Sequence, residues 1–150
     1  MASTHQYNKL QQGSYPNIKP GSNWIWVRVD FQLQPGGIDD TYNLYEVKNH
    51  WIVKNGFYRV TTDGGVATAT FDVQTNVGAN DMTAAIDLDR GDDVMTRFTA
   101  VNDDAPIPIV TSGLITGTLN TAAATSGIID LFFEIIVPHT NVDDVDSIAT

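Results

Sequence analysis

The chain has 150 residues, no cysteine, and 18 acidic against 8 basic residues, so its formal net charge is −10. A chain of this length can form one domain with a sizeable core, and without cysteine it has neither disulfides nor thiolate metal sites. Nucleic acid is an unfavourable partner, because binding phosphate requires basic patches. The apolar runs are far shorter than the ~20 residues of a membrane span, and MASTHQYNKLQQ has no signal-peptide core. We therefore expect no membrane partner and no export signal.

Both ends of the chain are polar and differ from the middle. Residues 1–23 contain Pro16, Pro20 and Gly21, which oppose helix, and predict an extended N-terminal arm. Its isolated apolar residues are the predicted partner contacts of the arm: Tyr7, Leu10, Tyr15 and Ile18. Residues 138–150 predict a short acidic C-terminal tail, which leaves residues 24–137 as the folded domain.

Regular structure is predicted to begin at Trp24. In WIWVRVDFQL the alternation places Val27, Val29, Phe31 and Leu33 on one face of a strand, with Trp24 and Trp26 on the other. One of these faces is therefore exposed or covered by a partner. Trp24 and Trp26 could pack in a core, contact another protein, or form a stacking platform for sugars. We predict that they bind a partner.

The segment Phe57–Val73, FYRVTTDGGVATATFDV, predicts two strands joined as a hairpin by Asp63-Gly64-Gly65. Before it, Tyr42–Val47 predicts a shorter strand. Trp51–Val53 could turn back at Asn55-Gly56 or run on into Phe57–Thr62, and we favour one long kinked strand, because a hairpin would leave very short arms.

The second half of the chain starts with residues 74–93, which show no clear period and predict a long loop with a helical turn near Asp81–Leu88. Further strands are then predicted, namely Val94–Val101, an edge strand Ile107–Val110, Gly113–Leu119 and Gly127–Val137. The inward residues of the domain should include Val29, Phe31, Val60, Phe71, Leu131, Phe133 and Ile135. The fold class is therefore all-β, an antiparallel β-sandwich or jelly roll of about eight strands.

No group of residues predicts catalysis or a cofactor. His5, His50 and His139 lack the spacing of a zinc site, and no nucleophile motif is present. The run Asp87–Asp93 resembles a calcium loop only in part, because its glycine is misplaced and the closing Glu is missing. We predict no enzyme and no metal site, although calcium at this run stays open.

From Tyr42 to Pro138 the chain resembles small structural proteins of tailed phages, especially environmental and cyanobacterial ones. The resemblance lies in FYRVTTDGGVATATFDV, the Asp-rich loop to Arg90-Gly91, NDDAPIPIVTSGLITGTLNTAAATSG and IIDLFFEIIVP. The resemblance implies that the chain is a β-sandwich component of a virion. Several proteins of this kind are capsid decoration or cement proteins, and the resemblance implies no catalytic residues.

The leading hypothesis is therefore a cement protein on the outer surface of a phage head, where it bridges subunits of the major capsid protein. Contacts to a repeating lattice add through avidity, and closed symmetry favours a homotrimer over a dimer. The alternative is a receptor- or glycan-binding module of a phage tail or fibre.

Overall fold

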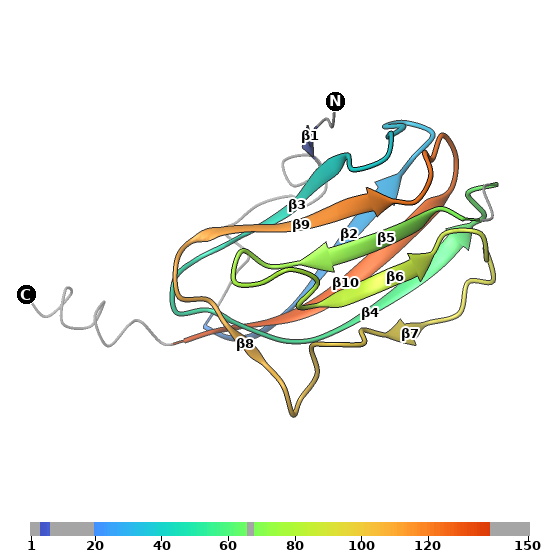
Figure 1. Ribbon diagram of the computed structural model, residues 1–150. Helices are drawn as coiled ribbons and strands as arrows, with labels where there is room; N and C mark the ends of the chain where they lie inside the picture. The colour runs from blue at the N-terminus through green and yellow to red at the C-terminus, as the bar shows by residue number, and fades with distance from the viewer. Residues whose placement is uncertain (1–3, 7–19, 66–67, 139–150) are drawn as a thin grey trace, which may run out of the picture.

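The computed structural model describes residues 4–6, 20–65 and 68–138, and none of them is helical (Figure 1). No helix in these ranges is therefore available to cross a membrane. The described strands are β1 (Thr4–Gln6), β2 (Gly21–Asp30), β3 (Thr41–Val47), β4 (Ile52–Thr62), β5 (Thr70–Gln74), β6 (Thr83–Asp87), β7 (Thr96–Arg97), β8 (Ile107–Pro108), β9 (Gly113–Asn120) and β10 (Ile128–Val137).

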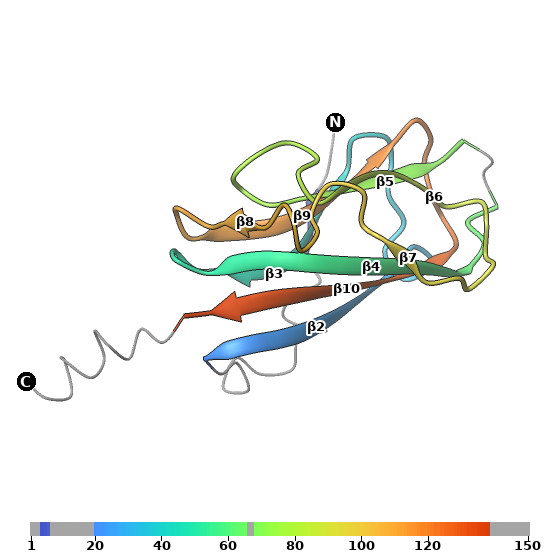
Figure 2. The same ribbon diagram turned by 90° about the horizontal axis from the view of Figure 1, so that it is seen from below.

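The strands form two sheets that face each other. One has the order β1-β3-β9-β5-β6, and the other has the order β2-β10-β4-β7, with β8 also paired to β4. Figure 2 shows β2, β10 and β4 side by side in one layer. Apart from the parallel pair β1–β3, the neighbouring strands run antiparallel. The predicted all-β sandwich is confirmed.

The core lies between the two sheets and is filled by every second residue of the long strands. All seven predicted inward residues are buried: Val29, Phe31, Val60, Phe71, Leu131, Phe133 and Ile135. Three aromatic rings pack together in the core. Phe31, Tyr42 and Phe71 meet edge to face, with ring centroids 5.5 to 5.7 Å apart. Such tilted contacts are the preferred packing of aromatic pairs.

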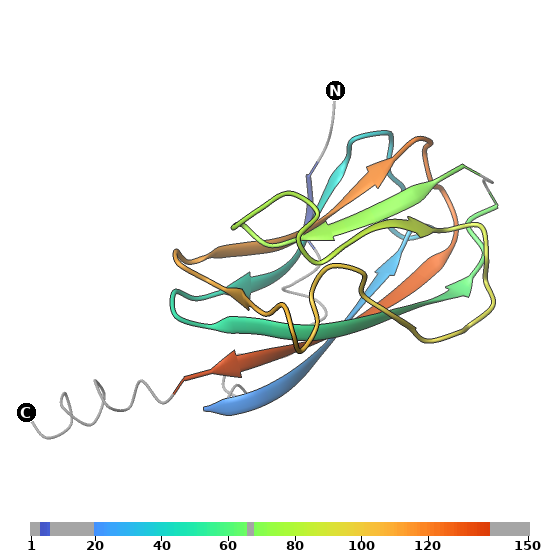
Figure 3. The same ribbon diagram turned by 60° about the horizontal axis from the view of Figure 1, so that its bottom comes forward.

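The hairpin predicted at Asp63-Gly64-Gly65 is wrong. β4 pairs with β10, β7 and β8, whereas β5 pairs with β9 and β6 in the opposite sheet (Figure 3). The local turn exists, since Asp63 Oδ1 accepts a hydrogen bond from the Gly65 N–H at 2.6 Å. It is part of a connection that crosses between the sheets, because alternation shows which face is buried but not which strand lies alongside.

Strand β4 is continuous from Ile52 to Thr62, as predicted, and it carries a bulge. Glu134 of β10 faces Asn55 while Ile135 faces Val53, so Lys54 is the extra residue. Position 56, two residues after Lys54, has no room for a side chain because the Phe98 ring packs directly on its backbone. A Cβ atom there would lie only 2.3 Å from that ring.

The loop with a helical turn predicted in residues 74–93 is also wrong in part, because Thr83–Asp87 forms the edge strand β6. A bulge explains the misleading pattern. Ala85 has φ of 53°, and its N–H donates to Asp72 Oδ1 at 2.6 Å, so two exposed residues separate the buried Thr83 and Ile86. Because of the extra residue, the buried positions are three residues apart, as in a helix, and not two apart, as in a regular strand.

Three other boundaries differ from the prediction. Leu33 is 78% exposed rather than inward, because Asp30 Oδ1 accepts hydrogen bonds from the backbone N–H groups of Gln32 and Leu33 and turns the chain after β2. The strand predicted at Val94–Val101 shrinks to Thr96–Arg97, and β2 begins at Gly21 rather than Trp24.

The predicted arm and tail lie mostly outside the described residues. This applies to Tyr7, Leu10, Tyr15 and Ile18 and to residues 139–150. Two parts of the predicted arm are described: Thr4–Gln6 forms β1 and pairs in parallel with β3 of the same chain, and residues 21–23 belong to β2. The roles predicted for the arm and tail stay predictions.

Substitution of a buried and of an exposed leucine by alanine should change the free energy of unfolding by clearly different amounts. Leu131→Ala should lower the free energy of unfolding by about 2–5 kcal/mol, because it opens a cavity between the sheets. Leu33→Ala removes the same atoms from an exposed site and should change it by less than about 0.5 kcal/mol. Urea unfolding measures both, and equal effects would contradict the assignment of the core.

Candidate interaction surface

The outer face of the sheet β2-β10-β4-β7 carries a row of large side chains. The strand register aligns Trp26 of β2, Phe132 of β10, Phe57 of β4 and Arg97 of β7. Each is next in sequence to a buried residue, so the four side chains point away from the core. We call Trp26, Phe132 and Phe57 the aromatic row.

Trp24 extends the aromatic row along β2. It lies two residues before Trp26, and its ring centroid is 6.0 Å from that of Phe57. Trp24 and Trp26 are 53% and 51% exposed, whereas Trp51 is buried in the core. The structure thus places both predicted partner-binding tryptophans on one open face, and their role as partner contacts stays a prediction.

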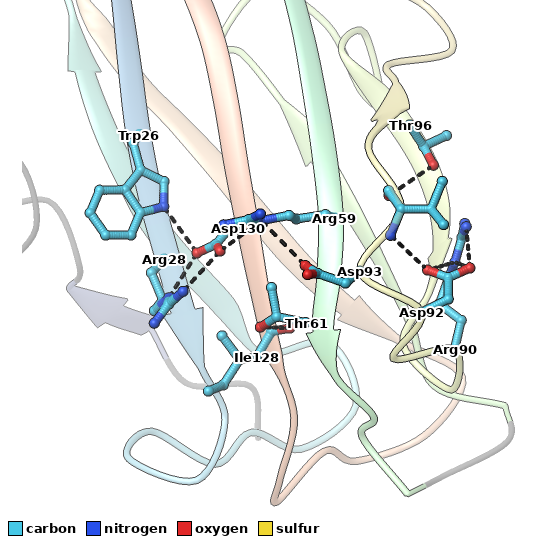
Figure 4. A network of polar contacts seen from close by, with 11 residues as sticks. Trp26, Arg28, Arg59, Thr61, Arg90, Asp92, Asp93, Thr96, Ile128 and Asp130 are labelled. Carbon is cyan, nitrogen blue, oxygen red and sulfur yellow. Dashed lines mark hydrogen bonds and ion pairs between the residues drawn. The ribbon is translucent and has the colours of Figure 1, made fainter.

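A polar row lies beside the aromatic row, with Asp130 of β10 at its centre (Figure 4). Arg28 binds the Asp130 carboxylate with two hydrogen bonds, Nε to Oδ1 at 2.8 Å and NH2 to Oδ2 at 2.9 Å. Arg59 Nε donates to Oδ2 at 3.3 Å from the other side, and Trp26 Nε1 donates to Oδ1 at 2.9 Å. Two arginines and an indole therefore converge on one carboxylate.

Asp130 is fully buried although it belongs to the outer face. Burial alone would raise the pKa of its carboxyl group, but the hydrogen bonds and charges of Arg28, Trp26 and Arg59 outweigh burial and lower it. The same contact raises the pKa of Arg28. Asp130 is thus ionised at neutral pH and holds its donors in fixed positions.

Each of three arginines on this face also lies over an aromatic ring. The guanidinium of Arg28 is 5.5 Å from the Trp26 ring centroid, that of Arg59 is 5.8 Å from Phe132, and that of Arg97 is 5.4 Å from Phe57. These distances suit cation–π attraction. We call this assembly of the aromatic row, Trp24, Asp130 and the three arginines the platform.

Most of the platform is not visible in the pattern of any single strand. Alternation in IIDLFFEIIV places Asp130 on the outward side of its strand, but its burial results from donors on β2 and β4, which one strand cannot show. A signal was available for Phe132, since an aromatic residue at an outward position of IIDLFFEIIV departs from alternation.

The acidic run Asp87–Asp93 is partly engaged in internal contacts. Arg90 binds Asp92 through Nε and NH2, with a shortest distance of 2.7 Å, and this lowers the pKa of Asp92. In the described ranges, no group of three or more His, Cys, Asp or Glu residues is arranged to hold a metal ion.

Comparisons with solved structures identify the fold. A chain of the structure "Capsid of Ralstonia phage GP4" aligns over 89% of this chain and 97% of its own, with a TM-score of 0.63 and 18% identity. The fold is shared with phage capsid structures. A chain of the structure "Cyanophage Pam1 capsid asymmetric unit" aligns over 87% of this chain and 96% of its own, with a TM-score of 0.58 and 18% identity.

A chain from "Acidic stable capsid structure of Helicobacter pylori bacteriophage KHP30" aligns over 81% of this chain and 91% of its own, with a TM-score of 0.58 and 12% identity. No protein-family model matches the sequence, and no curated protein matches it. The likeness therefore extends over nearly the whole described sandwich, at identities that show a common fold.

Asp130→Asn should lower the free energy of unfolding by about 1–3 kcal/mol at neutral pH, because it removes the charge that Arg28 and Arg59 bind. The effect is moderate because both arginine side chains are partly exposed, so water screens their attraction to the carboxylate. The folded-state pKa of Asp130 lies below its ordinary value of 3.8, so its stabilisation is complete above that pH. It is lost as the pH falls through the folded-state pKa.

The difference between wild type and Asp130→Asn should therefore shrink as the pH is lowered from about 7 to about 2, which urea unfolding at several pH values measures. Asp104→Asn changes an exposed aspartate and serves as the control, with an expected effect below about 0.5 kcal/mol at each pH. A difference that stays constant with pH would refute the charged role of Asp130.

Proposed function

We propose that this chain is a structural protein of a phage virion that decorates the head. It binds the outer surface of the capsid and bridges neighbouring subunits of the major capsid protein, which stabilises the shell. The carrying observation is the fold shared with chains of three phage capsid structures over at least 81% of this chain. The platform supports the proposal, because Trp and Arg side chains are enriched where proteins bind one another.

The strand order is a second argument. The sheets β2-β10-β4-β7 and β3-β9-β5-β6 are connected so that consecutive strands mostly alternate between them. We therefore propose that the sandwich is a jelly roll, an arrangement that viral capsid and lectin domains use. The arrangement makes a rigid body whose broad outer face is available for a flat partner surface.

The chemistry of the platform favours binding over catalysis. Its one buried carboxylate, Asp130, is bound by Arg28, Arg59 and Trp26, so it is held as a fixed anion rather than as a base that exchanges protons. We propose a non-enzymatic role without cofactor, nucleic acid or membrane partner.

The proposed assembly is a homotrimer on the capsid, with a dimer as the alternative. Closed rotational symmetry lets one surface make repeated contacts with a repeating lattice, and many modest contacts then add through avidity. The net charge of −10 would give the particle an acidic exterior that limits aggregation.

A receptor- or glycan-binding module of a phage tail or fibre is the second candidate. The half-exposed rings of Trp24 and Trp26 favour it, because flat exposed rings can stack on sugars. Copy number separates the two candidates. Hundreds of copies per particle support decoration of the head, whereas a few dozen or fewer support the tail.

Capsids assembled without this protein provide the direct test. Labelled wild-type protein should bind them in saturable fashion, and Trp24→Ala with Trp26→Ala should weaken binding about tenfold or more, because aromatic anchors dominate interface energies. The variant with Leu33→Ala and Ile38→Ala removes other exposed apolar side chains and is the control, with binding unchanged. Absence of wild-type binding would refute decoration of the head.

The N-terminal arm gives an independent test. Deleting residues 2–20 should leave a folded sandwich, because apart from the three-residue strand β1 the described strands begin at Gly21. Binding to the capsid should nevertheless drop sharply if the arm lies extended across capsid subunits, where Tyr7, Leu10, Tyr15 and Ile18 would anchor it. Decoration with unchanged affinity and heat resistance would show that the arm is not the attachment device.

A further inference from the structure

The basic residues of this acidic chain are unevenly distributed. The sequence contains 8 Lys and Arg residues against 18 acidic ones. Arg28, Arg59 and Arg97 all lie on the platform, each over an aromatic ring. Three of the four arginines of this acidic chain therefore lie on one face together with aromatic rings, whereas Arg90 pairs with Asp92 elsewhere.

The three arginines are not equivalent. Arg28 and Arg59 both bind the buried carboxylate of Asp130. Arg97 is exposed at the β7 end of the aromatic row, and within the described part of the chain it makes no ion pair or hydrogen bond through its side chain. Its cation–π contact with Phe57 restricts the side chain but leaves the edge of the guanidinium available. Such an edge matches the geometry of a carboxylate.

We propose that the platform is a docking site for a protein segment that carries a carboxylate next to apolar side chains, with Arg97 as the residue that selects the carboxylate. The apolar side chains lie across Trp24 and Trp26, and the carboxylate binds the guanidinium of Arg97. The inference rests on the proposed function in one respect, since the capsid would supply this segment.

Charge complementarity supports this occupant. With a net charge of −10 the chain as a whole repels an acidic segment, so attraction must come from the local field of the platform. Two of its arginines are neutralised in part by Asp130, and Arg59 also lies 3.6 Å from Asp93. Arg97 is thus the cation whose removal should matter most for an acidic partner.

Preorganisation explains how one exposed arginine can act selectively. Aromatic stacking holds Arg97 of β7 over Phe57 of β4, and Asp130 orients Trp26 and Arg28 on β2, at the other edge of the sheet. A surface fixed before binding loses less conformational entropy on association. Arg97 is therefore the specificity-determining residue of the docking site.

The decisive experiment is selection of a displayed library of random peptides on the full chain, with counter-selection on the Trp24→Ala, Trp26→Ala variant. Recovered peptides should contain Asp or Glu beside apolar residues. They should bind Arg97→Gln about tenfold more weakly than wild type, while Arg97→Lys, which keeps the charge but not the fork, should be intermediate. Lys48→Gln removes one positive charge at an exposed site on the β3 side and should leave affinity unchanged.

Two results would overturn the inference. In one, the peptides that depend on the tryptophans bind Arg97→Gln as tightly as wild type. In the other, the selection recovers peptides without acidic residues, or none that depend on the tryptophans. Circular dichroism and thermal unfolding of Arg97→Gln verify that this exposed substitution leaves the fold intact.

Binding to undecorated capsids separates this inference from the proposed function. If wild type fails to bind capsids but the selected acidic peptides require Arg97, the decoration role fails and the docking site stands. If wild type decorates capsids while the peptides bind without Arg97, the docking inference fails and the decoration role stands. Self-association that Arg97→Gln abolishes would identify a second copy as the source of the acidic segment, in agreement with the proposed chemistry.

Discussion

Strand β10 must satisfy opposite environments on its two faces, and the other features of the molecule depend on how it does so. It pairs with β2 on one side and β4 on the other along nearly its whole length. Inward, Leu131, Phe133 and their neighbours fill the core. Outward, Asp130 and Phe132 sit between residues of both adjacent strands. A buried carboxylate on a central strand must be compensated by the strands on either side, because unpaired burial of a carboxylate is very costly.

The compensation of Asp130 gives the outer face its properties. Arg28 and Arg59 approach from the two flanking strands, and their alkyl chains and guanidinium groups cover the carboxylate. The same arrangement brings the cations against Trp26 and Phe132. A face that would otherwise carry separate aromatic and charged residues thus becomes one connected surface.

Alternation of buried and exposed residues predicts the regular parts of the strands in this sandwich, but it fails at the bulges. The bulge at Lys54 keeps β4 continuous past Gly56, and the one at Ala85 makes β6 a strand despite a helix-like spacing of buried residues. Both depend on contacts distant in sequence, namely the Phe98 ring over Gly56 and the Asp72 carboxylate on the Ala85 N–H. A bulge adds one residue to the local period, so a pattern-based prediction fails where the extra residue lies.

The amino-acid sequence by itself determined the all-β class, the buried face of each long strand and the outward direction of Trp24 and Trp26. Each of these follows from the two-residue period of a strand, which is a local property. Tertiary structure alone decided which strands are neighbours. It sent β4 and β5 to opposite sheets although their turn predicted a hairpin, and it brought Arg28, Asp130 and Arg59 together from three strands. Sheet order depends on how all strands jointly close one core, and a period measured along a single strand contains no information about that closure.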